Sequence, residues 1–385
     1  MKKSAMITIF LSIVTIGVVS FFFLQTSLGT TANNETKKVK VTAHSARTQF
    51  DSKKELVQTA TVGAIGDILI HDWVYEDAKT GSTYDFKPML SPIKSYLQQP
   101  DFLIANQETI LGGVDLGLSS YPTFNSPQEV GDAFIDAGVD FVTNANNHSL
   151  DKGEKGILTE IDYFNKVGLP YVGAFKDAQD QQTIRVMNIN GIKAAILSYT
   201  YGTNGIPIPA GKDYLVNLID QEKMKAEIAR AKQMADVVIM GVHWGNEYQR
   251  MPSVAQKDLA QYLVNAGADI IIGHHPHVLQ PMEWLKADDG REAFVFYSLG
   301  NFLSGQMHDY KDIGGLATIT IKKTIKSTGV EIQLSDPSFI PTYVSNQELT
   351  DYRVVPLKDA TAYGLPNAAE KNEEITNHMA QWLTK

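Results

Sequence analysis

The sequence predicts an α/β fold built around one large core. From Leu56 onward, short β-rich runs alternate with helical patterns, which is the arrangement of stacked β-α units. Apolar residues make up 43% of the 385 residues and charged residues 20%, which leaves ample side chains for such a core. Several predicted strands end in Asp, Asn, Glu or His, and α/β proteins bind ligands beyond the carboxyl ends of their strands.

The predicted strands are apolar runs rich in β-branched and aromatic residues. They are Ala60 to Ile65, Phe102 to Ala105, Phe141 to Thr143, Ile192 to Tyr199, Val237 to Val242, Ile270 to Ile272 and Ala293 to Tyr297. After Gly315, alternating runs from Leu316 to Ile321 and from Val330 to Leu334 predict strands of a second sheet.

Capping residues predict the ends of several helices. Ser126, followed by a proline, predicts a helix that runs to Gly138, and Ser253 predicts one that ends at Gly267. The tail from residue 366 to 385 predicts a polar helix docked by a Met and a Trp side chain. We therefore divide this part of the chain into a main domain, 56–345, and a C-terminal extension with a helix, 346–385.

Two segments of the chain echo each other. IDAGVDFVTNANNH ends at His148, and VNAGADIIIGHHPH ends at His277. Each contains a helix end, a glycine turn, a buried strand and then polar residues that include histidine. This pattern predicts two β-α units of one sheet rather than a tandem repeat.

The N-terminal segment predicts a membrane anchor. Lys2 and Lys3 precede an uncharged, mostly apolar run of 20 residues, 5–24. At about 1.5 Å per residue this run spans about 30 Å, the thickness of a bilayer core. We expect an uncleaved transmembrane signal-anchor with residues 1–4 in the cytoplasm, residues 25–55 as a flexible linker and the main domain extracytoplasmic; cleavage near Ser27 and Gly29 is the alternative.

The net charge argues against nucleic acid as a partner, and the lack of cysteine excludes thiolate ligands at a metal site. The net charge of −9, with only short lysine runs, disfavours nucleic acid as a partner, since phosphate binding needs a clustered basic surface. The chain contains no cysteine, so a metal would have only nitrogen and oxygen ligands.

Polar side chains follow five of the predicted strands. Six of the nine histidines fall in these stretches, so we expect the polar groups to meet in one crevice. The residues concerned are Asp67, His71, Asn106, Glu108, Asn147, His148, His243, His274, His275 and His277. For Asp67, Asn106 and Glu108 a simple polar turn is the alternative, and Glu247 either orients His243 or is a solvated charge.

The segment from Gly273 to His277 carries the most specific signal, since three histidines in four positions have no packing reason. Asp, Glu, Asn and His ligands together suit one or two divalent ions such as Mn, Fe or Zn. Two such ions activate water and support in-line displacement at phosphorus, so phosphate ester hydrolysis is the natural reaction.

An ordered set of strings resembles the CapA/PgsA family of poly-γ-glutamate capsule proteins, which is similar to calcineurin-like metallophosphoesterases. The strings are GAIGDILIH, ANQET, NANNHSLDKG, VHWGNEY, IIIGHHPHVLQP and YSLGNF, and they cover roughly Thr61 to Phe302. The resemblance implies a four-layer α/β/β/α sandwich of the metallophosphoesterase type with a metal site at the strand ends.

The resemblance also implies roles for particular residues. His148 would protonate a leaving oxygen, with Asp151 as the nearest supporting acid. The implied metal ligands are Asp67, Glu108, Asn147, His243, His275 and His277. The residues expected to contact substrate or to support the ligands are His71, Asn106, His274, Glu247, Ser298 and Asn301.

Three positions depart from the phosphoesterase pattern. Leu69 stands where the pattern has a histidine, so one ligand is missing unless His71 replaces it. Ser149 follows the Asn-His pair where an acid is usual, and Glu108 stands in place of Asp. The number of metal ions and the catalytic competence of the site therefore stay open.

The expected function is a role in biosynthesis and export of a poly-γ-glutamate capsule or a related envelope polymer, with a metal-dependent hydrolase site. The expected partners are the cell membrane, polymer synthase subunits, and an anionic polymer or phosphorylated substrate. The alternatives are a general extracytoplasmic metallophosphoesterase and a non-catalytic polymer-binding or scaffold subunit of a synthase.

Overall fold

Two β-sheets pack face to face in the computed structural model, which describes residues 55–383. Sheet 1 has the strand order β16-β15-β14-β1-β4-β5-β6, with β13 also paired to β1. Its strands are β1 (Leu56–Leu69), β4 (Phe102–Gln107), β5 (Phe141–Thr143), β6 (Tyr171–Val172), β13 (Asn301–Ser304), β14 (Ile313–Lys326), β15 (Gly329–Gln347) and β16 (Thr350–Pro356).

Sheet 2 has the order β11-β12-β10-β9-β8-β7, and β8, β9, β10 and β12 run parallel. Its strands are β7 (Arg185–Ile189), β8 (Ile192–Thr200), β9 (Val237–His243), β10 (Ile270–His274), β11 (Leu279–Lys286) and β12 (Glu292–Leu299). A small hairpin is formed by β2 (Lys79–Thr80) and β3 (Thr83–Tyr84).

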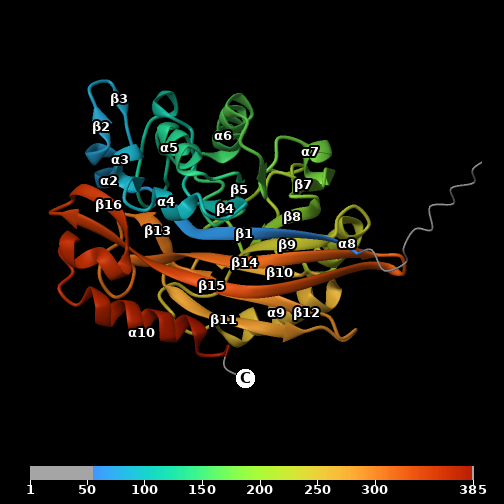
Figure 1. Cartoon of the computed structure of the whole chain (residues 1–385). Coiled ribbons are helices and arrows are strands. Elements are labelled where there is room, and N and C mark those ends of the chain that lie inside the picture. The colour runs from blue at the N-terminus through green and yellow to red at the C-terminus, as the bar shows by residue number, and fades with distance from the viewer. Residues whose placement is uncertain (1–54, 384–385) are drawn as a thin grey trace, which may run out of the picture. The chain divides into compact units, whose positions relative to one another are not determined.

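Helices cover the outer face of each sheet (Figure 1). Over sheet 1 lie α2 (Asp72–Asp77), α3 (Lys87–Leu90), α4 (Lys94–Leu97), α5 (Glu129–Ala137) and α6 (Gly153–Val167). Over sheet 2 lie α8 (Gln221–Lys232) and α9 (Val254–Ala266). The remaining helices are α7 (Ala178–Gln182), α10 (Ala368–Ala380) and the 3-10 turns Val114–Leu116 and Leu357–Tyr363.

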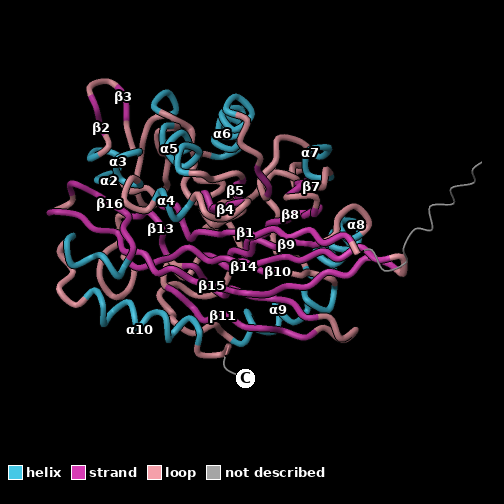
Figure 2. The backbone as a smooth tube through the Cα atoms, viewed as in Figure 1, coloured by secondary structure: helices cyan, strands magenta, loops and turns pink. Residues whose placement is uncertain are grey.

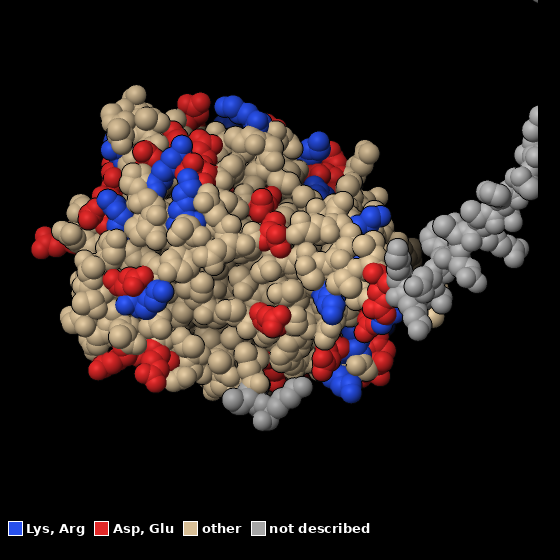
Figure 3. All heavy atoms as spheres, viewed as in Figure 1, with Lys and Arg blue, Asp and Glu red and all other residues tan. Residues whose placement is uncertain are grey.

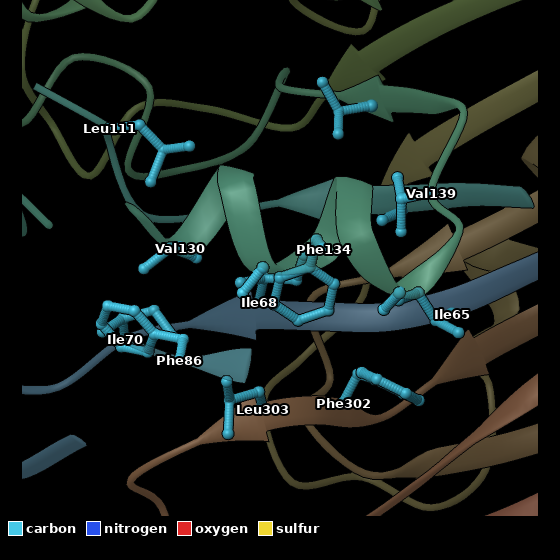
Figure 4. Packing of buried hydrophobic residues seen from close by; sticks show 14 of the residues in the cluster. Ile65, Ile68, Ile70, Phe86, Leu111, Val130, Phe134, Val139, Phe302 and Leu303 are labelled. Carbon is cyan, nitrogen blue, oxygen red and sulfur yellow. The ribbon is translucent and has the colours of Figure 1, made fainter. Parts of the chain in front are cut away.

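The two-residue period of the strands divides the core into three apolar layers. In β1, Val62 and Ala64 face the inner layer between the sheets, whereas Ile65 and Ile68 face the helices over sheet 1. Figure 4 shows this outer layer, where Phe134 of α5 lies over β1. The layers therefore run helix, sheet, sheet, helix, and the predicted α/β fold is confirmed.

All seven predicted strands lie within strands of the structure, but the second sheet is not the one expected. The runs 316–321 and 330–334 lie in β14 and β15, which extend sheet 1 (Figure 2); β14 is antiparallel to β1, and β15 is antiparallel to β14. The reason is that β14 aligns with β1 from Leu56 opposite Ile325 to Ile65 opposite Leu316. Sheet 2 is built instead from the middle of the chain.

The two echoing segments also belong to different sheets, which corrects the prediction that they share one. The segment that ends at His148 contains β5 of sheet 1, and the segment that ends at His277 contains β10 of sheet 2. The chain leaves sheet 1 after β6, builds sheet 2, and returns to sheet 1 through β13. Each segment thus brings its polar residues to the same junction from a different sheet.

The predicted helix ends are confirmed in part. Ser253 caps α9 together with Gln256 in a reciprocal capping box, and Gly267, with a φ of +121°, follows its last turn. The prediction that Ser126 starts a helix was wrong, because α5 begins at Glu129 and the Ser126 hydroxyl donates to Thr109 Oγ1 at 2.9 Å instead.

The segment 346–385, expected as a C-terminal extension with a helix, is integrated into the sandwich as far as it is described. β16 pairs with β15, and α10 packs on β11 and β15 with Met379 fully buried in the inner layer. Among residues 55–383 no helix is long and apolar enough to cross a bilayer. The predicted cytoplasmic tip, the anchor at 5–24 and the linker up to residue 54 lie outside the described residues.

Candidate metal centre

The predicted ligands come from the carboxyl ends of strands in both sheets. Asp67 lies in β1, while Glu108 and Asn147 follow β4 and β5 of sheet 1. His243 ends β9 of sheet 2, and His275 and His277 follow β10. All six side chains are buried. The crevice is therefore made by the two sheets together, rather than by one sheet as the sequence pattern suggested.

Glycines allow the backbone to pack closely beside the candidate ligands. A Cβ at Gly66 would lie 2.0 Å from the carbonyl oxygen of Gly300, and the Asp67 N–H donates to that oxygen at 2.8 Å. A Cβ at Gly273 would lie 2.0 Å from the carbonyl oxygen of Tyr297. Any larger side chain at Gly66 or Gly273 would displace the backbone that holds the adjacent ligands.

The first group of candidate ligands is formed by Asp67, Glu108 and His277, whose ligand atoms all lie within 4.8 Å of one another. Asp67 Oδ2 lies 3.2 Å from His277 Nδ1, and Glu108 Oε1 lies 3.7 Å from His277 Nε2. Asn106 donates to Asp67 Oδ1 at 2.9 Å. Asn106 therefore orients the carboxylate and is not itself one of the grouped ligands.

The second group is formed by Glu108, His243 and His275, again within 4.8 Å. His243 Nε2 lies 3.5 Å from Glu108 Oε1 and 2.8 Å from Asn147 Oδ1. Asn147 thus adds a neutral oxygen to this group. Because Glu108 belongs to both groups, it occupies the position of a bridging carboxylate.

Burial and mutual charge shift the pKa values of these residues in opposite directions. Burial and the nearby Asp67 charge raise the pKa of Glu108 to about 8. Burial opposes ionisation of Asp67, yet hydrogen bonds from His274 and His277 hold its pKa well below the usual value. Burial lowers the pKa of His275 to about 2, so this imidazole is neutral.

His277 is the exception among these imidazoles. Burial alone would lower its pKa, but the carboxylates of Glu108 and Asp67 outweigh burial and raise the pKa to about 9. In the absence of a cation, a proton on His277 therefore compensates part of the carboxylate charge.

Unpartnered polar atoms indicate that the cluster is built for a cation. Both carboxylate oxygens of Glu108, and Nδ1 of His243 and of His275, are buried without a hydrogen-bond partner. Such groups destabilise a fold unless something else satisfies them. Mixed carboxylate, amide and imidazole donors at these separations fit one or two divalent ions. The metal itself is an inference from these donors.

His148 and Asp151 form a pair beside the two groups. Asp151 Oδ2 lies 2.6 Å from His148 Nδ1 and accepts the backbone N–H of Phe124 at 2.6 Å. A carboxylate has no proton to give, so His148 Nδ1 carries the hydrogen and Nε2 is left for a substrate. The predicted pairing of these two residues is present in the structure.

The histidine loop has an unusual backbone. His275 and His277 have φ values of +98° and +57°, a region that residues with a Cβ rarely adopt. The His275 N–H points to Asp67 Oδ2 at 3.4 Å, and His277 Nδ1 lies 3.0 Å from Asn301 Oδ1. The strained loop aims both imidazoles at the carboxylates.

The remaining predicted residues divide into two sets. His274, Asn301 and Glu247 lie against the cluster: His274 Nδ1 is 3.2 Å from Asp67 Oδ1, and Glu247 groups with His275 and His277. His71 belongs to none of the candidate ligand groups among the described residues. The Gly305 N–H donates to His71 Nδ1 at 3.2 Å, and the His71 ring stacks on Trp73. The structure therefore does not support His71 as a substitute for the histidine ligand that is missing at Leu69.

Ser298 is buried and bonds to nearby backbone, and it is not exposed on a surface that a substrate could reach. Its hydroxyl donates to the carbonyl oxygen of Val278 at 2.8 Å and lies 3.2 Å from the N–H of Gly300, which donates to it. It is fully buried. Ser298 therefore fixes the loop between β12 and β13, which fits the expected supporting role rather than the alternative of substrate contact.

Two residues at the site were not predicted from the sequence. Asn204 Oδ1 accepts from Asn147 Nδ2 at 3.2 Å, which turns the Asn147 oxygen toward His243. The ring of Tyr201 lies 4.5 Å from that of His275. A pocket of about 390 Å³ opens beside His148 and is lined also by Tyr121, Pro122, Thr123, Asn147, Asp151, Asn204, Ile206 and Glu247.

Comparison with known proteins identifies the family of this chain. The family model described as "Bacterial capsule synthesis protein PGA_cap" matches residues 61–306, which is more than half of the chain. The chain belongs to this family. The matched residues of this capsule synthesis family member include every candidate ligand from Asp67 to His277.

Two named relatives share this family resemblance. The chain is 33% identical over 255 residues to the capsule biosynthesis protein CapA of Bacillus anthracis, covering 64% of this chain and 60% of that protein. It is 38% identical over 167 residues to the PGA biosynthesis protein CapA of Bacillus subtilis (strain 168), covering 43% and 42%. The chain thus matches less than two thirds of the length of either relative.

A solved structure, the 5′-nucleotidase precursor from Thermus thermophilus, aligns with a TM-score of 0.43 at 12% identity. The alignment covers 83% of this chain and 58% of that one.

Proposed function

We propose that this protein acts in biosynthesis of a poly-γ-glutamate capsule or a related envelope polymer, and that its site is a metal-dependent hydrolase centre for phosphate esters. The supporting observation is Glu108, a buried carboxylate with both oxygens unpartnered, which lies between two groups of histidines. The named relatives support the polymer assignment.

Each residue of the site has a distinct role in this proposal. Bound divalent ions would supply Lewis-acid activation of the phosphoryl group and of water. Asp67, Glu108, Asn147, His243, His275 and His277 would hold them. As the acid, His148 would carry protons on both ring nitrogens and give the Nε2 proton to the leaving oxygen, while Asp151 accepts from Nδ1–H and holds the ring in place before and after the transfer.

The full-length chain tests the catalytic part of the proposal. After removal of metal and reloading with Mn²⁺, we expect it to hydrolyse a chromogenic phosphodiester. His148→Ala should abolish turnover while metal content is unchanged, and His308→Ala, at an exposed histidine, should leave both unchanged. A metal-loaded wild type that hydrolyses neither phosphate monoesters nor diesters would contradict this part.

Non-catalytic binding of an anionic polymer is the second candidate, and it also requires a cation, because the acidic Glu247 lines the pocket and would otherwise repel such a chain. Polymer-producing cells that lack their own copy separate the two readings. If the His275→Ala variant restores polymer production as well as wild type does, and the purified protein contains no metal, both catalytic functions are excluded. A non-catalytic scaffold role is then the remaining function.

We also propose that the run at 5–24 anchors the protein in the membrane with residues 56–385 outside. The support is the length and lack of charge of that run. Intact cells treated with protease should lose the domain, and a variant without residues 5–24 should leave the membrane fraction. Protection of the domain in intact cells would contradict the orientation.

A further inference from the structure

One acidic side chain at the site has no role in the chemistry described above. Glu247 lies on the loop between β9 and α9, shortly after His243 and Trp244. The Tyr248 N–H donates to the carbonyl oxygen of Pro276 at 2.8 Å, which ties this loop to the histidine loop. Gly245 and Tyr248 adopt φ values of +88° and +65°, so the loop turns sharply on both sides of Glu247.

The Glu247 carboxylate belongs to the ligand cluster by distance. A carboxylate oxygen of Glu247 and ring nitrogens of His275 and His277 all lie within 4.8 Å of one another. His277 also belongs to the group with Asp67 and Glu108, so the groups overlap through shared residues. Unlike the other carboxylates of the cluster, Glu247 is exposed and lines the pocket beside His148.

Neighbouring cations do not account for this position. Arg250 pairs with Glu374 at 3.3 Å, and Lys311 pairs with Asp309 at 3.6 Å. None of the ion pairs formed among the described residues involves Glu247, although Tyr248 and both histidines are close to it. A carboxylate held next to two buried imidazoles, one of them with an unpartnered Nδ1, therefore has no lysine or arginine partner among the described residues.

The number of donors in the two groups differs. Glu108, His243 and His275 gain a fourth donor from Asn147 Oδ1. The group of Asp67, Glu108 and His277 has only three. Divalent zinc takes four ligands in proteins, and manganese prefers more oxygen ligands. The three-donor group is therefore incomplete unless another side chain or water contributes.

We infer that Glu247 is a metal ligand of this site, which would bind an ion together with His275 and His277, the two imidazoles whose ring nitrogens lie within 4.8 Å of its carboxylate. Glu247 is exposed, whereas the other candidate ligands are buried. The inference rests on the proposed metal site and adds a ligand to it.

Metal titration of the full-length chain tests the inference without relying on turnover. Metal-stripped wild type, Glu247→Gln and the control Glu370→Gln, an exposed glutamate on α10, are titrated with Mn²⁺ by calorimetry. We expect Glu247→Gln to weaken one binding event by at least about 10-fold and to leave any second event unchanged. Glu370→Gln should match wild type in both.

Two further results distinguish failure of the proposed metal site from failure of the role assigned to Glu247. If wild type binds no divalent ion, the proposed metal site itself is wrong. If wild type binds metal and Glu247→Gln binds it with the same stoichiometry and affinity, only the role of Glu247 is overturned. Equal melting temperatures of the metal-free proteins are expected, and a large drop for Glu247→Gln would overturn the inference in favour of a role in the fold.

Discussion

His243 Nε2 lies 2.8 Å from Asn147 Oδ1, although the two residues are 96 positions apart and belong to different sheets. The contact places the candidate metal site at the junction of the two sheets. Surface charge is not concentrated in the same way, since basic and acidic side chains are interspersed on the face seen in Figure 3. The six candidate metal ligands are therefore buried at the junction of the two sheets.

The unpartnered carboxyl of Glu108 should destabilise the metal-free protein. We expect Glu108→Leu to raise the free energy of unfolding of the metal-free chain by about 1–3 kcal/mol, because it removes a buried group without hydrogen bonds. The same variant should lose the stabilisation that added metal gives to wild type. Urea denaturation with and without Mn²⁺ measures both effects.

Glu160 provides the matched control for Glu108. It is equally buried, but its two oxygens accept from Leu111 N at 3.1 Å and Asn144 Nδ2 at 3.2 Å. Glu160→Leu leaves those donors unpaired and should lower the free energy of unfolding by about 3 kcal/mol. Equal effects of Glu108→Leu and Glu160→Leu would show that hydrogen bonding does not distinguish the two sites.

Metal binding should release protons and strengthen as pH rises. The pKa values of Glu108 and His277 are raised to about 8 and about 9, so both groups hold protons near pH 7 when no metal is bound. A cation has to displace them, and affinity should rise by about tenfold per pH unit for each proton until these pKa values are passed. Calorimetry in buffers of different ionisation enthalpy counts the protons; a result independent of buffer contradicts the prediction.

Asp151 should matter for turnover and not for metal binding. Asp151→Asn replaces the carboxylate that holds His148 Nδ1, so the imidazole loses its fixed tautomer. We expect kcat to fall by about 10²- to 10⁴-fold with phosphate esters, with metal affinity unchanged. A parallel loss of metal affinity would mean that Asp151 supports the ligands instead.

His71 should contribute to acid sensitivity of the fold. Burial lowers its pKa to about 4, whereas an unfolded chain has a histidine pKa of about 6.5. The unfolded chain therefore binds the proton first as pH falls, and stability is lost between about pH 6.5 and 4, by on the order of 3 kcal/mol at most. His71→Phe keeps a ring beside Trp73 and should make the decline shallower by one proton. An unchanged slope in urea denaturation from pH 7.5 to 4.5 rules this out.

Much of the fold could be predicted because it depends on local patterns. Apolar runs such as Ile270 to Ile272 are fully buried strands in the structure, and the Ser253 cap depends only on its own turn. The assignment of strands to sheets could not be predicted in this way. β14 pairs with β1 across most of the chain, and alternation alone is equally compatible with either sheet.

The site could be predicted where a residue type is unusual at a strand end, as with His275 and His277. Asn204 gave no such signal, since an Asn-Gly pair in a loop is typical of a turn. Its role depends on the fold bringing it to Asn147. Ser298 left substrate contact and support both open, because a serine after a strand is equally suited to bonding nearby backbone, as it does here.

The pairing of β1 with β14 has a consequence for how the protein is made. β1 is translated early, yet its long antiparallel partner ends only at Lys326. Until the ribosome has passed that point, one edge of β1 has no partner, and Asp67 is produced long before the histidines that surround it. A nascent chain of this protein must therefore be kept from aggregating until synthesis is nearly complete, and the candidate metal site can be assembled only at the end of folding.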